Sequence, residues 1–262
     1  MRKDATNVEE ARLKGVERID DYPSFHERHR IFPGVFDGRN HNRILDVAAG
    51  VGCAARRIHD NYPAELVCND IAPTCLRVLE RQGLRTVSFD IDDDDTVFPF
   101  PDGYFDAVVS LATIEHIIFL DHHLKEIRRI LSNQGYLYIS TPNYAGLTHL
   151  PGYLFKGESF HNPLREKSKY EFYAHVRYFT FKTILEFVSS FGFTPVEVYL
   201  PLPESSSCYR AMQAKSPLKA WAFRSSMWLL YTLGSPRWAS EPVICFQKTD
   251  QKPATKYRKV VL

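Results

Sequence analysis

The chain has 262 residues, 44% of them hydrophobic and 24% charged, a composition typical of a globular protein with one large domain. Its 33 basic and 31 acidic residues leave a formal net charge of +2. Such a balance lacks the basic field that drives nucleic-acid binding, so we expect no nucleic-acid partner. The first ten residues lack the apolar stretch of a secretory signal, which predicts a cytoplasmic protein.

The cysteines and a run of aspartates could indicate a disulfide or a metal site, but their spacing favours neither. The five cysteines contain no C-x-x-C pair, which argues against a zinc site or a disulfide framework and favours buried free thiols. Residues 92–95 are four consecutive aspartates, and carboxylate clusters can bind hard cations. Because consecutive side chains cannot all point inward, a solvated loop is the favoured interpretation. We therefore expect no metal site.

Short β-like runs alternate with helix-like stretches over the first 140 residues. The runs are residues 43–47, 65–68, 85–89, 105–110 and 135–140. Their alternation predicts a parallel sheet with helices on both faces. Pro73 and Gly83 are placed to start and end one helix, while Asp121 and Gly135 are placed to cap and stop another. The second helix has core residues at helical spacing, namely Leu124, Ile127 and Leu131.

The C-terminal part continues this pattern with two interruptions. A helix is predicted from Thr180 to Phe191, ending at Gly192, and strands are predicted at residues 194–200 and 241–246. The expected fold is therefore α/β, with seven mostly parallel strands. Residues 144–174 and 203–240 fall outside the alternation, and we expect inserted cap segments there on the ligand side of the sheet.

The segment Ile44–Ile58 has the pattern of a strand, a glycine turn and the start of a helix. Gly50 and Gly52 let a ligand approach the backbone closely, and the following helix presents free N–H groups. The string from Gly50 to Ala55 also satisfies the G-x-G-x-x-A form of the dinucleotide-binding fingerprint. An NAD-dependent oxidoreductase is therefore a real alternative at this point.

Acidic residues stand at the ends of three successive predicted strands. Asp46 lies four residues before Gly50, where a negative charge does not help to seat a pyrophosphate but suits a cationic amino-acid group. Asp70 is placed to accept hydrogen bonds from ribose hydroxyls in either kind of site. Asp90, beside the apolar Ile91, is suited to hold an adenine amino group. A single aspartate at such a position is usually a turn or cap residue, but the ordered set of three favours a binding site.

These residues carry a resemblance to a known family. The matching strings are Asp46–Gly52, Asp70–Pro73, Asp90, Phe98–Ser110, Ile114–His116 and Glu126–Gly135. In order and spacing they are similar to the class I S-adenosylmethionine-dependent methyltransferase superfamily, over roughly residues 40 to 200. The family pattern is Asp-x-Gly-x-Gly-x-Gly, and Ala48 stands here at the first glycine. The resemblance implies a Rossmann-like sheet, S-adenosylmethionine as cofactor and S-adenosylhomocysteine as product.

The resemblance also implies a role for each matching residue. Asp46 and the glycine turn should surround the methionine part, Asp70 should bind the ribose, and Asp90 with Ile91 should hold the adenine. The opposite wall should be lined by residues 110–112. The expected cofactor-binding residues are therefore Asp46, Ala48, Gly50, Gly52, Asp70, Ile71, Asp90, Ile91, Ser110, Leu111 and Ala112.

Methyl transfer requires mainly that the acceptor be oriented and water excluded, but a hydroxyl acceptor must also lose a proton. The candidate catalytic residues are Glu115, His116 and His175, with Asn143 as a further candidate. The strings Ser140–Asn143, His175–Thr180 and Phe191–Phe193 resemble methyltransferases that act on glycans, antibiotic sugars or quinone precursors. They favour O-methylation of a small-molecule or glycan acceptor. N-methylation, C-methylation and a non-catalytic S-adenosylmethionine-binding protein stay open.

The segment Leu218–Leu233 predicts a helix that is apolar nearly all round, with Leu218, Trp221 and Trp228 on one face. Burial against the rest of the domain or a second subunit is the favoured expectation. Contact with a membrane surface or a lipid-linked acceptor is the alternative, for which the flanking cations are suited. The domain organisation we expect is an N-terminal helical segment over the cofactor site (1–40), the methyltransferase domain (41–249) and a disordered tail (250–262).

Overall fold

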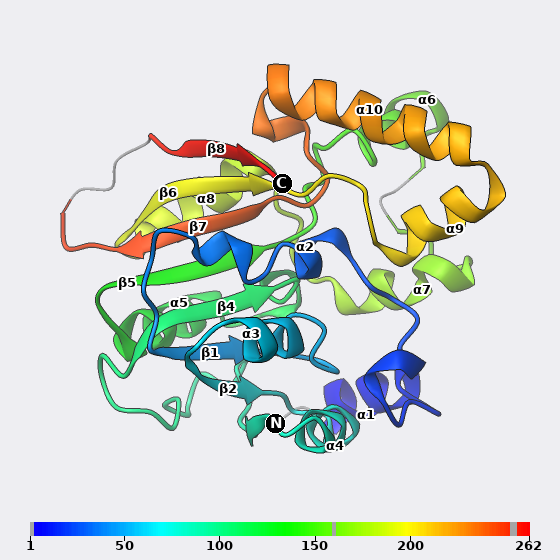
Figure 1. The fold of residues 1–262 in the computed structure, drawn as a ribbon. Helices are drawn as coiled ribbons and strands as arrows, with labels where there is room; N and C mark the ends of the chain where they lie inside the picture. The colour runs from blue at the N-terminus through cyan, green and yellow to red at the C-terminus, as the bar shows by residue number, and fades with distance from the viewer. Residues whose placement is uncertain (1–2, 159–160, 252–255) are drawn as a thin grey trace.

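A computed structural model describes residues 3–158, 161–251 and 256–262 (Figure 1). One sheet of eight strands forms its centre, in the order β3-β2-β1-β4-β5-β7-β6-β8. The strands are β1 (Arg43–Val47), β2 (Glu65–Asn69), β3 (Arg85–Val87), β4 (Phe105–Leu111), β5 (Leu131–Ser140), β6 (Phe193–Leu200), β7 (Val243–Lys248) and β8 (Arg258–Val261). Strands β1 to β5 are parallel, and β7 runs antiparallel to both of its neighbours, β5 and β6. The mostly parallel α/β sheet predicted from the sequence is confirmed.

The additional strand corrects two expectations, the count of seven strands and the disordered tail. Residues 258–261 form β8, which pairs in parallel with β6 so that Val260 lies opposite Tyr199. The C-terminal leucine continues this pairing, since its N–H donates to the Leu200 carbonyl at 3.1 Å. The sequence pattern missed β8 because a four-residue edge strand with two charged residues gives no alternation. Residues 252–255 lie outside the described part of the tail.

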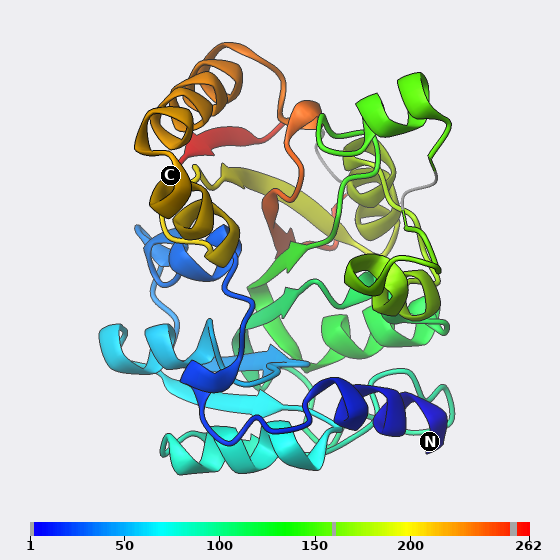
Figure 2. The ribbon, with the colours of Figure 1, turned by 90° about the vertical axis from the view of Figure 1, so that its right-hand side faces the viewer.

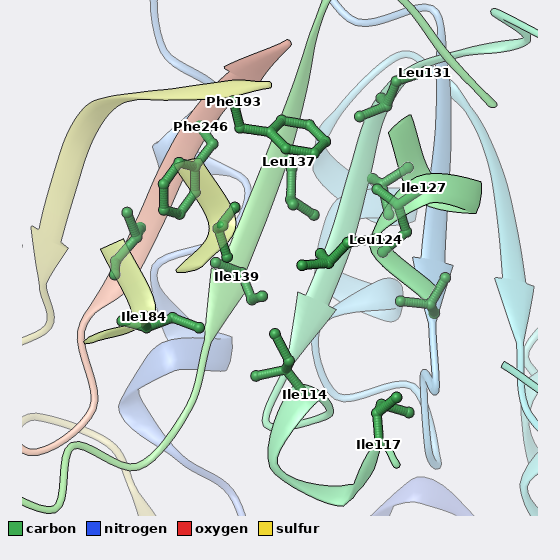
Figure 3. Close-up of a cluster of buried hydrophobic side chains, with 14 of the residues drawn as sticks. Ile114, Ile117, Leu124, Ile127, Leu131, Leu137, Ile139, Ile184, Phe193 and Phe246 are labelled. Carbon is green, nitrogen blue, oxygen red and sulfur yellow. The ribbon is translucent and has the colours of Figure 1, made fainter. Parts of the chain in front are cut away.

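Helices cover both faces of the sheet, because successive side chains on each strand point to opposite faces. On one face, Val108 and Leu137 pack with α5 (Leu120–Ile130) and α8 (Phe181–Ser190). Figure 3 shows this cluster, with Leu124 and Ile127 of α5 among its members. On the other face, Val109 and its neighbours pack with α3 (Ala55–Asn61), α4 (Pro73–Arg81) and the segment after α2 (Glu27–Arg30).

Two predicted boundaries around α5 are wrong, although its core residues are confirmed as fully buried. Asp121 lies inside the first turn of α5, which follows Phe119 as its N-terminal flanking residue. The helix ends at Ile130, and β5 begins directly at Leu131, so Gly135 lies within a strand. The register between β4 and β5 shifts at this point. A Cβ on Gly135 would lie 3.0 Å from the Ser132 carbonyl oxygen, so the irregular strand, not a helix stop, requires glycine there.

The segments outside the alternation gather at the end of the sheet to which the parallel strands point (Figures 1 and 2). They comprise α1 (Lys3–Arg12) from the N-terminus, α6 (Leu150–Lys156) and α7 (Glu166–Ala174) from the first insertion, and α9 (Ser207–Lys215) and α10 (Pro217–Leu233) from the second. Figure 2, viewed from that end, shows α1, α7 and α9 around the strand ends. In open α/β sheets ligands bind at this end, so the insertions flank the expected site.

The outer face of α10 is exposed, which corrects the expectation that the helix is buried against its own domain. Leu218 is 73% exposed, Trp221 66% and Trp228 51%, whereas Ala220 and Tyr231 on the opposite face are buried. Within the described part of the chain, no helix is long and apolar enough to cross a membrane. The expectation of buried thiols holds only in part, because all five cysteines are free but Cys208 is exposed.

Candidate functional site

A cavity of about 870 Å³ opens at the carboxyl ends of β1, β2 and β4. Its walls come from the turn after β1, the ends of β2 and β4 and the loop at residues 90–94. Residues of the N-terminal segment and α7 complete the lining, among them Arg12, Arg28 and Tyr170. Segments far apart in sequence thus meet at one site because parallel strands end on the same edge.

The turn after β1 lies against the cavity through Ala48 and Gly50, both with left-handed backbone conformations at φ +52° and +58°. A Cβ on Gly50 would meet no atom within 4 Å, so a ligand can approach the backbone there. Gly52 does not line the cavity, and its backbone is also left-handed at φ +90°. A Cβ at Gly52 would lie 2.8 Å from Cδ2 of Leu79, so glycine is needed for close packing of the turn on α4.

Asp46 is a buried carboxylate at the cavity wall without a partner among the described residues. It is 3% exposed, and burial, with the nearby Asp70, raises its pKa to about 8. Asp70 is also buried, which raises its pKa to about 6 against the opposing effect of three backbone N–H groups, those of Gly50, Ile71 and Ala72. Its Oδ2 accepts from the Gly50 N–H at 2.9 Å and its Oδ1 from the Ala72 N–H at 2.8 Å. Each oxygen of Asp70 retains capacity for a further donor.

The loop after β3 forms the next part of the wall, through Asp90 and Ile91. Asp90 Oδ1 accepts from the Asp92 N–H at 3.0 Å, and Asp92 Oδ1 accepts from the N–H groups of Ile118 and Phe119 at 2.8 Å each. Asp92 therefore fixes this loop to the segment before α5. Of the three aspartates that follow, Asp93 is half-buried and Asp94 and Asp95 are exposed, so the predicted solvated loop holds for the end of the run but not for Asp92.

The end of β4 supplies the opposite wall. Leu111 and Ala112 line the cavity as expected, but Ser110 does not, because its side chain points to the other face of the strand and is fully buried. Its Oγ has no hydrogen-bond partner in the described part of the chain. Ile71 joins the lining from the end of β2.

The three predicted catalytic residues lie together at one end of the cavity. Glu115 and His116 belong to a short 3-10 helix (Ile114–His116), and His175 directly follows α7. The rings of His116 and His175 meet edge to face with centroids 4.7 Å apart. His116 lines the cavity, whereas Glu115 and His175 lie behind it. The backbone fixes this contact, since the Glu115 carbonyl accepts from the Val176 N–H at 2.9 Å.

Burial controls the protonation of this cluster. It raises the pKa of Glu115 to about 8 and lowers the pKa of His116. Burial and the neighbouring histidines lower the pKa of His175 to about 3. Both imidazoles are therefore neutral at physiological pH, and a neutral imidazole can accept a proton or bind a cation.

Asn143, the further candidate, is a structural residue. Its amide nitrogen donates to the carbonyls of Arg237 and Ala239 at 2.7 Å each, and its Oδ1 accepts from the Phe181 N–H at 3.0 Å. These bonds join the end of β5 to α8 and to the segment before β7. Its side chain is thereby committed, and it has no place in the chemistry.

The sequence did not predict the residues that close the cavity from the N-terminal side. Tyr170 of α7 donates to Glu9 of α1 at 2.8 Å, and the Arg12 guanidinium lies over the Tyr170 ring, 5.1 Å from its centroid. Glu10 accepts from both the N–H and the hydroxyl of Thr74 at the start of α4, at 2.8 Å each. Only the i, i+3 spacing of Glu9 and Arg12 was visible in the sequence, and it does not reveal contacts with α7.

The donor set of the cavity fits S-adenosylmethionine. The unpaired, buried carboxyl group of Asp46 is suited to a cationic amino-acid group. The Asp70 oxygens can each accept a further hydrogen bond, which suits a ribose diol. Open space over Gly50 leaves room for close approach, and apolar side chains at positions 71, 91 and 111 are suited to the faces of an adenine ring. Asp46 would instead repel a pyrophosphate, which disfavours a dinucleotide.

Comparisons with known proteins agree with this arrangement. Residues 45–139 match the family described as "Methyltransferase domain". A malonyl-[acyl-carrier protein] O-methyltransferase of Geobacter sulfurreducens is 35% identical over 137 residues, which are 50% of this chain and 51% of the relative. A demethylmenaquinone methyltransferase of Thermus thermophilus is 36% identical over 102 residues, 37% of this chain and 46% of the relative. The chain spans about half the length of these curated relatives.

Solved structures extend the likeness over more of the fold. Phosphoethanolamine N-methyltransferase 2 of Haemonchus contortus, in complex with S-adenosyl-L-methionine, superposes with a TM-score of 0.56 at 20% identity. The superposition covers 85% of this chain and 52% of that one. At this identity the likeness concerns the fold alone.

Proposed function

We propose that the chain is a class I S-adenosylmethionine-dependent methyltransferase and that it transfers a methyl group from S-adenosylmethionine to a hydroxyl of a small molecule or glycan, which its similarity to the methyltransferase domain family and to methyltransferase relatives supports. The observation that carries the proposal is the unpaired, buried carboxylate of Asp46 in the wall of a cavity large enough for cofactor and acceptor. Bound S-adenosylmethionine supplies an activated methyl group as an electrophile.

The chain's own residues hold the cofactor and keep water away. Asp46 binds its amino group, Asp70 its ribose hydroxyls, and Asp90 its adenine amino group. The N-terminal segment forms the roof over this site, tied to α4 through Glu10 and to α7 through Glu9. Such closure excludes water from the reacting groups, which displacement at a sulfonium methyl requires.

The cluster of Glu115, His116 and His175 handles the proton of the acceptor hydroxyl. Only His116 among the three lines the cavity, so it is the member that faces the acceptor. A hydroxyl needs such a group more than an amine or an activated carbon does, which favours O-methylation over N- or C-methylation. The two insertions, residues 144–174 and 203–240, form the cap that selects the acceptor.

Isothermal titration with S-adenosylhomocysteine tests cofactor binding, with NAD as the control ligand. We expect saturable binding in the micromolar range for the first and no comparable binding for the second. Sugars, phenols and acids can then be screened for release of S-adenosylhomocysteine. Binding of NAD instead would overturn the assignment, and binding without turnover on any hydroxyl acceptor would contradict the proposed O-methylation.

We also propose that α10 rests on an anionic membrane surface while the acceptor is bound. The segment from residue 205 to 240 contains five cations and no acidic residue, in a chain of net charge +2. Its outer face exposes the two tryptophans Trp221 and Trp228, which suit the interface between lipid headgroups and acyl chains. Lys259 bonds the carbonyls of Thr232 and Gly234, which fixes the end of the helix on the domain.

Cosedimentation with liposomes tests this contact. The wild type should sediment with phosphatidylserine vesicles at low salt and less with neutral vesicles, because cations and apolar side chains act together. The double variant Trp221→Glu with Trp228→Glu should lose the binding, while Val97→Glu, at a residue 61% exposed outside α10, should keep it. A wild-type protein that stays in the supernatant disproves membrane contact, and a dimer seen by light scattering would then identify a second copy as the occupant.

A further inference from the structure

Glu115 is buried in an unusual state. Its side chain is 0% exposed, and neither carboxylate oxygen has a hydrogen-bond partner in the described part of the chain. Leaving a buried carboxylate unpaired is costly, so such a group is expected to have a cation or ordered water as partner. The Thr141 hydroxyl, which directly follows β5, lies near enough to act on the Glu115 carboxyl, but it makes no hydrogen bond of normal geometry with it. A single neutral hydroxyl does not satisfy two buried carboxylate oxygens, so a cation is a suitable further partner.

Two imidazoles next to Glu115 are oriented as metal ligands are. Nδ1 of His116 lies 3.1 Å from the Ala174 carbonyl oxygen, which can only accept, so Nδ1 carries the proton and Nε2 keeps its lone pair. Nδ1 of His175 is bonded to the Tyr144 hydroxyl at 2.7 Å, which leaves Nε2 available for a ligand. Metal-binding histidines typically have their second ring nitrogen held by a carbonyl or another polar group in this way.

We propose that Glu115, His116 and His175 bind a divalent transition-metal cation. One oxygen of Glu115 and one ring nitrogen of each histidine lie within 4.8 Å of one another, a separation that small side-chain movements can close around one ion. Two imidazoles and one carboxylate suit Zn²⁺ or Fe²⁺, whereas Mg²⁺ prefers oxygen ligands. No short-range ligand spacing in the sequence indicates this set, because His116 and His175 are 59 positions apart.

The cation has a consequence for the reaction that rests on the proposed function. Three protein ligands leave a coordination position open. Because His116 both lines the cavity and binds the ion, the ion lies next to the cavity. An acceptor hydroxyl that coordinates the ion loses its proton more readily, because a bound cation lowers the pKa of a coordinated hydroxyl. The cluster would then act on the acceptor proton through the ion, with His116 as a ligand.

Metal binding can be measured without an acceptor. Protein freed of metal with EDTA is titrated with ZnCl₂ by calorimetry, and Co²⁺ is added separately to record its visible absorption. We expect one Zn²⁺ per chain with micromolar or tighter affinity, Co²⁺ bands typical of nitrogen and oxygen ligands, and no comparable binding of Mg²⁺. His175→Ala and the nearly isosteric Glu115→Gln should each weaken Zn²⁺ binding by about 100-fold.

His149→Ala is the matched control, because His149 packs near the same tyrosine, Tyr144, outside the three ligands. It should keep wild-type Zn²⁺ affinity. Binding of S-adenosylhomocysteine is measured for every variant and shows that each one has folded. No saturable Zn²⁺ binding, or equal binding in Glu115→Gln and His175→Ala, overturns the metal site. If cofactor binding persists in that case, the proposed function stands and ordered water is the partner of Glu115.

Discussion

The cofactor edge of the sheet and the two inserted segments hold their functional residues in different ways. At the cofactor edge, Asp46 lies within the end of β1, Asp70 directly follows β2, and Asp90 lies in the loop after β3. The pairing of β1, β2 and β3 brings them to one edge. In the insertions, His175 reaches its place through a segment of more than thirty residues and is held by Tyr144. The first kind of site is fixed by sheet topology, while the second depends on packing between distant segments.

This difference teaches where specificity is built. A cofactor shared by a whole superfamily can be bound by the invariant geometry of parallel strand ends. An acceptor that differs between relatives has to be bound by segments that can change without disturbing the sheet. Cofactor affinity should therefore depend on the first region, and turnover should depend on the second.

The largest effect is expected for Asp46→Asn, which removes the ionisable group proposed to bind the cofactor amino group. We expect its affinity for S-adenosylmethionine to fall by more than about a hundredfold, as for the loss of one partner of a buried ion pair. Wild-type affinity should rise from pH 6 to pH 8, because Asp46 with its pKa of about 8 must lose a proton to bind a cation. Calorimetric titration across this range measures both effects.

The same variant should gain stability without ligand, which separates a binding role from a structural one. The folded state keeps the Asp46 proton up to about pH 8, while the unfolded state loses it near the ordinary pKa of 3.8, so wild-type stability falls as pH rises between these values. Asparagine does not ionise. Asp46→Asn should therefore be more stable than the wild type at pH 8 and similar to it at pH 4, by thermal unfolding. Lower stability at pH 8 would assign Asp46 to the structure.

In the acceptor region, His116→Ala or His175→Ala should lower turnover roughly a hundredfold and leave cofactor affinity nearly unchanged. His116 faces the cavity and His175 holds it edge to face, so loss of either disrupts one cluster. Release of S-adenosylhomocysteine with an acceptor found in the screen gives the rate, and calorimetry gives the affinity. His122→Ala, at a half-buried histidine on α5 outside the lining of the cavity, is the control and should keep full activity. Full activity in both cluster variants would show that positioning alone supports the reaction.

Asp70→Ala has an intermediate effect on the cofactor edge. Loss of an acceptor for two ribose hydroxyls should weaken cofactor binding by about 1.5 to 3 kcal/mol. Asp70 also accepts from the N–H groups of Gly50 and Ala72, so alanine would loosen the turn as well. Asp70→Asn keeps one accepting oxygen, so its cofactor affinity should lie between those of the wild type and Asp70→Ala. Unchanged affinity in Asp70→Ala would remove Asp70 from the binding site.

The cofactor edge and the inserted segments also differ in how much of each could be predicted from the sequence. The acidic strand ends and the buried residues of α5 were predictable, because a strand end and a helical period are local patterns. Gly52 and Ser110, which the pattern placed in the site, do not line the cavity, since the pattern does not tell which face of a turn or strand a side chain takes. The contacts of Tyr170 with α1 were invisible, because they join segments more than 150 positions apart. No periodicity encodes such a contact.

The smallest expected effect concerns the departure from the family pattern at Ala48. Its φ of +52° is unfavourable for any residue with a Cβ, at a cost of about 1 kcal/mol relative to glycine. Ala48→Gly should raise the free energy of unfolding by up to about that amount and leave cofactor affinity within twofold, because no Ala48 side-chain contact is needed. The control is Ala211→Gly, at an exposed position inside α9, which should lower stability by roughly 0.5 to 1 kcal/mol. Denaturant titration compares the two variants. Equal destabilisation by both would mean that the left-handed turn carries no strain, and that alanine is preferred there for its packing at the cofactor edge.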